Sequence, residues 1–114
     1  MVDACFAIRL DRPVGDTVRV VVTGQADLAS SDVLFAALAE AVAIDGVRHV
    51  DVDLTGVDLL DAAAVGVLLA VRHRAQRRRT TLRVTGAAGL PLQVLEITGV
   101  LGLLGGKSET GPGS

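Results

Sequence analysis

The sequence contains no tryptophan, no tyrosine and only two phenylalanines, Phe6 and Phe35. Because 50% of its 114 residues are hydrophobic, the core must be built from aliphatic side chains. Cys5 is the single cysteine, which excludes an intrachain disulfide and suits a reducing compartment. A chain of this length is typical of one domain.

Long apolar runs are also lacking. No stretch approaches the roughly 20 residues that a membrane-spanning helix needs. The N-terminal residues, MVDACFAIRL, do not place a basic segment before an apolar one, so they are not expected to form a signal peptide. We therefore expect a cytoplasmic protein without membrane insertion.

The familiar catalytic motifs are missing as well. We find no Ser/His/Asp or Cys/His set beside a strand-to-helix turn, and no GxxxxGK[ST] phosphate loop. The glycines at 102, 105 and 106 do not follow a strand into a helix, so they form no nucleotide fingerprint. The sequence predicts a protein that is not an enzyme and has no cofactor.

Charge is unevenly distributed, although the net charge is only −2. The segment from residue 27 to residue 61 contains a single arginine, Arg48, but many acidic residues. These are Asp27, Asp32, Glu40, Asp45, Asp51, Asp53, Asp58 and Asp61. Between residues 72 and 83 there is no acid, and the arginines are Arg72, Arg74, Arg77, Arg78, Arg79 and Arg83. This arginine cluster has no interleaved aromatic residues, so a solvated helix end is favoured over RNA or lipid binding. We expect no direct DNA binding.

Hydrophobic periodicity predicts the order of elements. Period-2 alternation and apolar runs predict strands at 5–10, 17–24, 47–54, 80–86 and 100–105. Helical spacing predicts helices between 30 and 46, over 62–76 and over 90–99. The order ββαβαβαβ indicates an α/β fold with a mixed, largely parallel β-sheet that opens with an antiparallel hairpin. We expect one domain over 1–104 and a disordered tail over 105–114.

The strand at 47–54 indicates how the sheet is covered. Its apolar residues face one way, whereas His49, Asp51 and Asp53 face the other. A strand buried on both faces would be apolar on both, so we expect helices mainly on one face and both aspartates exposed. The three polar side chains have a spacing that could hold a metal, but no second ligand cluster supports one, and we favour a solvated face.

Helix starts can be assigned from capping residues. Ser30 or Ser31 is expected to cap the first helix, and Asp61 the second. An Asx turn is the simplest role for Asp27, which follows a strand. Residues 62–64, three alanines, are good helix formers in a first turn and equally suit a partner-docking surface.

Three segments, in this order, resemble the STAS domain, the fold of bacterial anti-sigma-factor antagonists. GQAD at 24–27 is similar to the family's G-E-L-D after the second strand. VRHVDVDLTGVDLLD at 47–61 resembles the third strand and the turn into D-S-S-G. LPLQVLEITGVLGLL at 90–104 is similar to the third helix and the strand after it. The resemblance covers nearly the whole chain and implies a STAS-like fold.

In that family, the serine after the turn aspartate is phosphorylated by the partner anti-sigma factor, which is also a kinase. Here Asp61 matches the aspartate and Ala62 matches the phosphoacceptor serine. The resemblance implies a transcription regulator that binds a kinase-type anti-sigma factor by partner switching, without phosphorylation at this turn. The implied partner-binding residues are Asp27, Ser30, Asp58, Asp61, Ala62, Ala63 and Gly66.

Other interpretations stay open. A STAS-like subunit of a lipid ABC transporter assembly and a nucleotide-binding STAS sensor are the alternatives. Thr55 and Ser30 are the nearest alternative phosphoacceptors. A homodimer is a further alternative.

Overall fold

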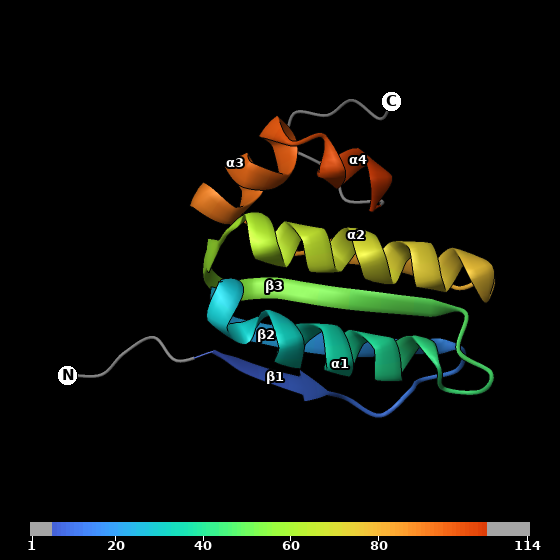
Figure 1. The fold of residues 1–114 in the computed structure, drawn as a ribbon. Helices are drawn as coiled ribbons and strands as arrows, with labels where there is room; N and C mark the ends of the chain where they lie inside the picture. Colours follow the sequence, from blue (N-terminus) through green and yellow to red (C-terminus); the bar gives the residue numbers. More distant parts are fainter. Residues whose placement is uncertain (1–5, 105–114) are drawn as a thin grey trace.

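The structure is a computed structural model and describes residues 6–104. The predicted tail at 105–114 and the predicted start of the first strand at Cys5 lie outside the described residues. The elements are β1 (Ala7–Leu10), β2 (Thr17–Ala26), η1 (Leu28–Ser30), α1 (Ser31–Val42), β3 (His49–Leu60), α2 (Ala62–Arg77), β4 (Thr81–Thr85), α3 (Gly89–Ile97) and α4 (Val100–Leu103) (Figure 1). Over residues 6–104, no helix is both long and apolar enough to cross a membrane.

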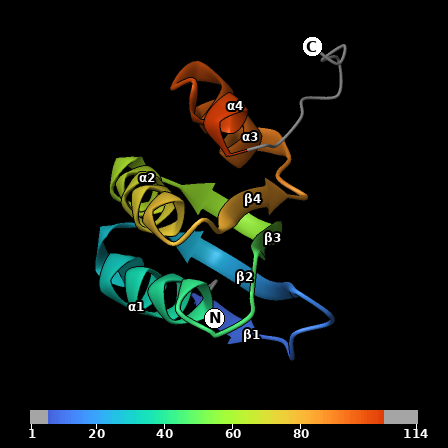
Figure 2. The same cartoon turned by 90° about the vertical axis from the view of Figure 1, so that its right-hand side faces the viewer.

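The four strands form one sheet in the order β1-β2-β3-β4. β1 pairs antiparallel with β2, whereas β2–β3 and β3–β4 are parallel. α1 and α2 lie side by side on one face of the sheet, and α3 and α4 lie beyond the β4 border (Figure 2). The predicted fold class, a mixed and largely parallel sheet with helices mainly on one face, is confirmed.

The core lies between the sheet and the two long helices. Valines that alternate along β2 and β3 point into it, and Val18, Val20, Val50 and Val52 are fully buried. Leu38 of α1 and Val71 of α2 meet them from the other side and are also fully buried. The residues between these valines point to the open face, so the period of 2 separates core from solvent.

The prediction that Asp51 and Asp53 are both exposed is wrong for Asp53. Asp51 is half-buried, but Asp53 is only 6% exposed. An unpaired buried carboxylate would be very costly. The Asp53 carboxylate is bound by Arg19 on the neighbouring strand and by Thr55, two residues along the chain. Asp53 is therefore buried as part of an ion pair on the open face of the sheet.

The predicted last strand at 100–105 is also wrong, because Val100–Leu103 forms the short helix α4. Gly99 has a φ of 76°, which starts a new turn after α3. A short apolar run fits a buried helix as well as a strand, and burial of Val100, Leu101 and Leu104 is achieved here with helical spacing. The carbonyl of Leu104 still accepts a bond from the Val84 amide, at 3.3 Å, so the segment does reach the border of β4.

β3 is longer than predicted and continues to Leu60 instead of ending at residue 54. It stays paired with β2, with register shifts between Val21 and Thr23 and between Gly24 and Gln25. These irregularities break the alternation that sequence patterns rely on. The extension brings Asp58 onto the strand and carries the chain directly into Asp61 and α2.

Candidate docking surface

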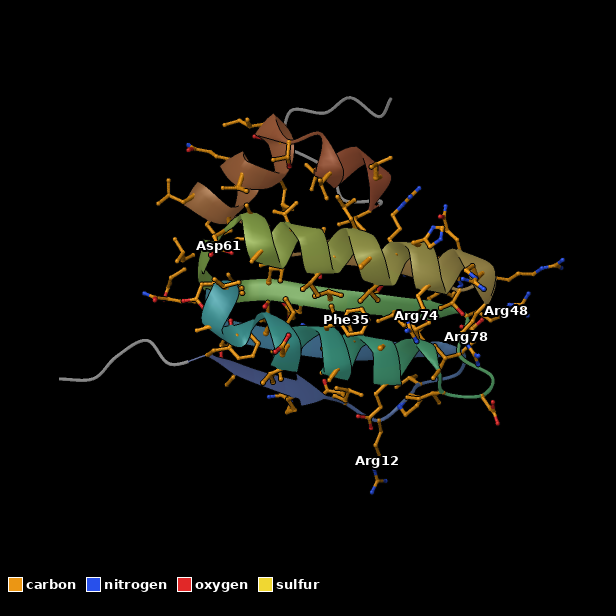
Figure 3. All side chains as sticks on the ribbon, in the orientation of Figure 1. Arg12, Phe35, Arg48, Asp61, Arg74 and Arg78 are labelled. Carbon is orange, nitrogen blue, oxygen red and sulfur yellow. The ribbon has the colours of Figure 1, made fainter. Side chains whose placement is uncertain are left out.

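Asp61 stands at the junction where β3 ends and α2 begins. Its Oδ1 accepts a hydrogen bond from the Ala64 amide at 3.1 Å, which confirms it as the N-cap of α2. Its Oδ2 accepts a second bond, from the Leu28 amide, at 3.1 Å. One carboxylate therefore caps α2 and also fixes the loop that follows β2. Figure 3 labels Asp61 at the junction of β3 and α2.

Asp27 and Ser30 form a reciprocal capping box around the 3₁₀ turn η1, an element that the sequence did not predict. Asp27 Oδ1 accepts from the Ser30 amide at 3.1 Å, and Ser30 Oγ accepts from the Asp27 amide at 3.0 Å. Ser30 occupies the N-cap position of α1 but gives that helix no side-chain bond. The prediction that a serine side chain caps α1 is therefore wrong for Ser30, because its hydroxyl takes part in the capping box of η1 instead.

The predicted partner-binding residues gather at one end of the molecule around Asp61. We call the following residues the cap surface: Asp27, Leu28, Ser30, Asp58, Asp61, Ala62, Ala63 and Gly66. Ala62, Gly66 and Asp58 are exposed, whereas Ala63 and Asp27 are half-buried. Ser30 is buried, so its contribution is to shape the loop and not to contact a partner.

Exposed apolar side chains, which sequence reasoning missed, adjoin these residues. Leu28 is 74% exposed and Val33 is 53% exposed. A shallow hollow of about 360 Å³ lies beside them and is lined by Phe6, Gln25, Asp27, Ala29, Ser30 and Val33. The apolar signal was present in the sequence as Leu28 directly after Asp27, but its exposure depends on the 3₁₀ turn.

The hydroxyls of the two alternative phosphoacceptors, Ser30 and Thr55, are already engaged. Ser30 Oγ lies 3.2 Å from the carbonyl of Gln25 and is buried. Thr55 Oγ1 donates to Asp53 Oδ1 at 2.6 Å. Both alternative phosphoacceptors would have to give up these bonds to be modified.

The polar strand face at 49–53 is occupied by ion pairs. Arg83 binds Asp51 at 2.9 Å, and Arg19 binds Asp53. The Thr55 hydroxyl, together with Arg19 and the Thr55 amide, lowers the pKa of Asp53 to about 2 against the opposing effect of burial. Among residues 6–104 no group of three His, Cys, Asp or Glu side chains is placed to hold a metal ion.

The fold and the cap surface define a small α/β module that presents a hydrogen-bonded, partly apolar turn at one end of two parallel helices. The family model described as "Mlab, STAS domain" matches residues 10–105. The chain therefore belongs to the STAS family. No curated protein sequence matches it.

Solved structures with the same fold include two kinds of protein. An anti-sigma factor antagonist from Mycobacterium paratuberculosis has 18% identity and a TM-score of 0.78, covering 90% of this chain and 86% of that one. The phosphorylated Bacillus cell fate determinant SpoIIAA has 17% identity and a TM-score of 0.68, covering 91% and 94%. A sulfate transporter family protein from Wolinella succinogenes has 19% identity and a TM-score of 0.67, covering 81% and 73%. These likenesses show the STAS fold.

Proposed function

We propose that this chain is a regulatory binding module, without catalytic activity, that docks a kinase-type anti-sigma factor through the cap surface. The observation that carries the proposal is the double role of Asp61, which holds the start of α2 and the Leu28 loop together. A preformed surface loses little conformational entropy on binding. Exposed Leu28 and Ala62 supply its apolar contacts.

We further propose that this docking is not switched by phosphorylation at the turn. Ala62 stands where the family resemblance places the phosphoacceptor. A phosphate would add about −1.5 to −2 charges at pH 7, next to the carboxylates of Asp27 and Asp61. With a methyl group at this position, the turn keeps a small side chain and cannot gain the charge of a phosphate.

The test is Ala62→Glu, measured against a purified kinase-type anti-sigma factor from the same organism. In the free protein the new carboxylate lies in the first turn of α2, where the helix dipole favours an anion by about 0.3–1 kcal/mol. In the complex it becomes a buried unpaired charge that costs several kcal/mol. We expect affinity to fall about 100-fold or more, at 1.4 kcal/mol per decade, with thermal unfolding nearly unchanged.

Gln76→Glu is the matched control, because it adds the same charge roughly 20 Å away along α2. Its affinity should equal that of the parent. Incubation of the pair with ATP should leave the mass of the chain unchanged. Equal binding by the Ala62→Glu variant and the parent would show that the cap surface is not where the anti-sigma factor docks.

The second candidate is a STAS-like subunit of a lipid ABC transporter assembly. Ala62 favours it, because a permanent complex needs no phosphoacceptor to release its partner. Affinity purification of the tagged chain distinguishes the two: a permease and its ATPase, stoichiometric with the chain, support the transporter subunit. The same Ala62→Glu variant then tests whether that complex uses the cap surface.

A further inference from the structure

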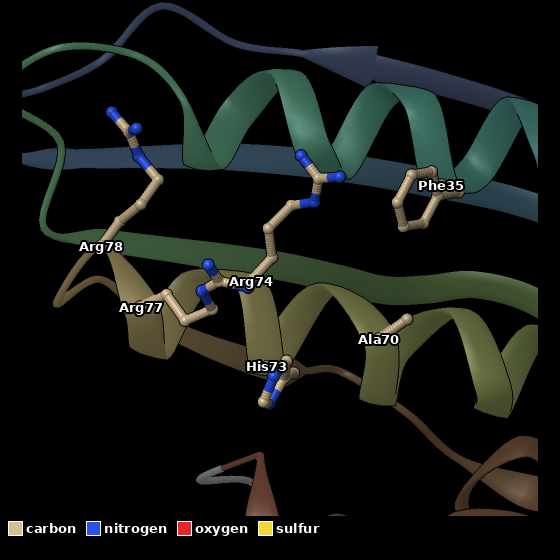
Figure 4. Close-up of a pocket in the computed structure, with 6 residues that line it drawn as sticks. All are labelled: Phe35, Ala70, His73, Arg74, Arg77 and Arg78. Carbon is tan, nitrogen blue, oxygen red and sulfur yellow. The ribbon is translucent and has the colours of Figure 1, made fainter.

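The opposite end of α1 and α2 carries the arginine cluster, whose members have different structural roles. Arg83 pairs with Asp51 on the open sheet face, and Arg72 donates to the Leu103 carbonyl at 2.9 Å. Arg74, Arg77 and Arg78 instead line one hollow of about 630 Å³, together with Phe35, Ala70 and His73 (Figure 4). This volume falls within the range of about 300–1,000 Å³ that is typical of small-molecule sites.

Two of these arginines are held in place by groups other than carboxylates. The Arg74 guanidinium lies over the Phe35 ring, 5.4 Å from its centroid. Arg78 donates from Nε to the Val42 carbonyl at 3.2 Å, and from Nη2 to the Ala43 carbonyl at 3.4 Å. Both side chains reach from α2 toward α1 (Figure 4). Since a guanidinium has five N–H donors, each keeps donors for a ligand.

The positive charge of this hollow is not neutralised by its lining, which includes no carboxylate. The ion pairs found over residues 6–104 join Arg9 to Asp11, Arg19 to Asp53 and Arg83 to Asp51, all away from the hollow. The C-termini of α1 and α2 contribute about −0.5 charge each. Against the guanidiniums of Arg74, Arg77 and Arg78, this leaves an excess of about two positive charges.

We propose that this hollow is a binding site for a phosphate monoester group. Such a group carries about −1.5 to −2 charges at pH 7, which matches the excess. Guanidinium forks fit phosphate oxygens with paired hydrogen bonds. Phe35 and Ala70 give the site an apolar wall for the organic part of the ligand. The phosphate belongs either to a soluble phosphomonoester or to the headgroup of phosphatidic acid.

A single-strand nucleic acid is a poorer fit to the same residues. Sequence-tolerant nucleic-acid binding uses several aromatic side chains on which bases stack. Phe35 is the only aromatic residue in the lining, so no second ring is present on which a further base could stack.

The experiment titrates the full chain with phenyl phosphate, and with benzoate as the carboxylate counterpart, by calorimetry and amide chemical shifts. We expect phenyl phosphate to bind more tightly and to shift amides at the ends of α1 and α2. Arg77→Gln should weaken the binding of phenyl phosphate about ten-fold or more, the value of one charge-assisted hydrogen bond. The affinity of Arg77→Lys should lie between those of the parent and of Arg77→Gln. Arg12→Gln removes the same charge outside the hollow, so its affinity should stay near that of the parent.

Vesicles of phosphatidylcholine with and without phosphatidic acid identify the source of the phosphate. Binding only to phosphatidic acid vesicles, lost in Arg77→Gln, assigns the site to the headgroup; tighter binding of phenyl phosphate assigns it to a soluble ligand. Equal affinity for benzoate and phenyl phosphate, an equal loss in Arg12→Gln, or no binding to any probe would overturn the proposal. Arg77 lies at the far end of α2 from the cap surface. Arg77→Gln should therefore leave anti-sigma-factor docking unchanged, so the two proposals are tested separately.

Discussion

Asp53 shows how a single residue on the open sheet face contributes to stability through its charge. It is buried and pairs with Arg19. It also accepts hydrogen bonds from the hydroxyl and the amide of Thr55. These donors lower its pKa from 3.8 to about 2. A lowered pKa means that the ionised carboxylate is bound more favourably in the folded state than in the unfolded one.

We predict that Asp53→Asn lowers the free energy of unfolding at pH 7 by about 2 kcal/mol, the equivalent of its pKa shift. The contribution is fully present above the unfolded pKa near 3.8 and is lost as the pH falls toward 2. Urea unfolding between pH 7 and 2 should therefore be less pH-dependent for the variant below pH 4. Asp51→Asn is the control, and should cost less because the Asp51 side chain is 27% exposed, against 9% for that of Asp53. Equal losses for the two variants would contradict this account.

At the C-terminal end of α2, the backbone adopts a conformation that usually requires glycine, but the sequence has an arginine there. The Arg79 amide bonds to the Gln76 carbonyl and the Thr80 amide to the Ala75 carbonyl, the pattern of a Schellman motif, in which glycine is the usual residue. Arg79 instead has a φ of 60°. A side chain in this left-handed conformation costs roughly 1–2 kcal/mol.

We predict that Arg79→Gly raises the free energy of unfolding by about 1 kcal/mol, because glycine relieves this strain but adds unfolded-state entropy. Gln76→Gly, three residues earlier and inside α2, should lower it by up to about 1 kcal/mol. Thermal and urea unfolding of the two variants check the opposite signs. Destabilisation by both substitutions would mean that the Arg79 side chain contributes more than its backbone costs.

At the level of elements, sequence patterns predicted the helices and strands that bury one face and expose the other. Buried and more exposed positions alternate along β2, and Asp61, the residue before α2, can cap that helix, so both elements were found. The patterns failed where tertiary contacts decide. The end of β3 depends on register shifts against β2, and α4 depends on which surface buries Leu101 and Leu104.

The polar residues of the candidate surface were predictable, but exposed Leu28 and the connections between the residues were not. Asp27 and Asp61 were identified from capping logic and family resemblance. The bond from the Leu28 amide to Asp61 Oδ2 joins residues 33 positions apart, and no local pattern encodes it. The burial of Asp53 was missed for the same reason, because its partner Arg19 lies on another strand.

The molecule as a whole depends on its C-terminal helices to complete the core. Leu104 is fully buried, whereas its neighbour Leu103 is 52% exposed. We predict that Leu104→Ala lowers the free energy of unfolding by about 2–5 kcal/mol, as expected for a buried leucine. Leu103→Ala should change it by less than about 1 kcal/mol. Denaturant unfolding checks both, and similar small effects would show that α4 is dispensable for the fold.

Charge is also organised across the whole molecule. Asp61 stands at one end of α2, and Arg74 and Arg78 stand near the other (Figure 3). Each sign complements the dipole at its own helix end. The two candidate sites are thus separated by the length of a helix, so that a ligand at one leaves the surface at the other accessible.

The bond between the Leu104 carbonyl and the Val84 amide has a further effect on how copies of this chain behave at high concentration. Exposed strand borders are templates onto which other chains add and from which fibres grow. At β4 the Val84 amide is engaged by the chain's own C-terminal segment, and at the opposite border β1 has four residues, Ala7–Leu10, within the described part of the chain. Short or partly engaged borders of this kind limit the addition of further strands, although half of the sequence is hydrophobic.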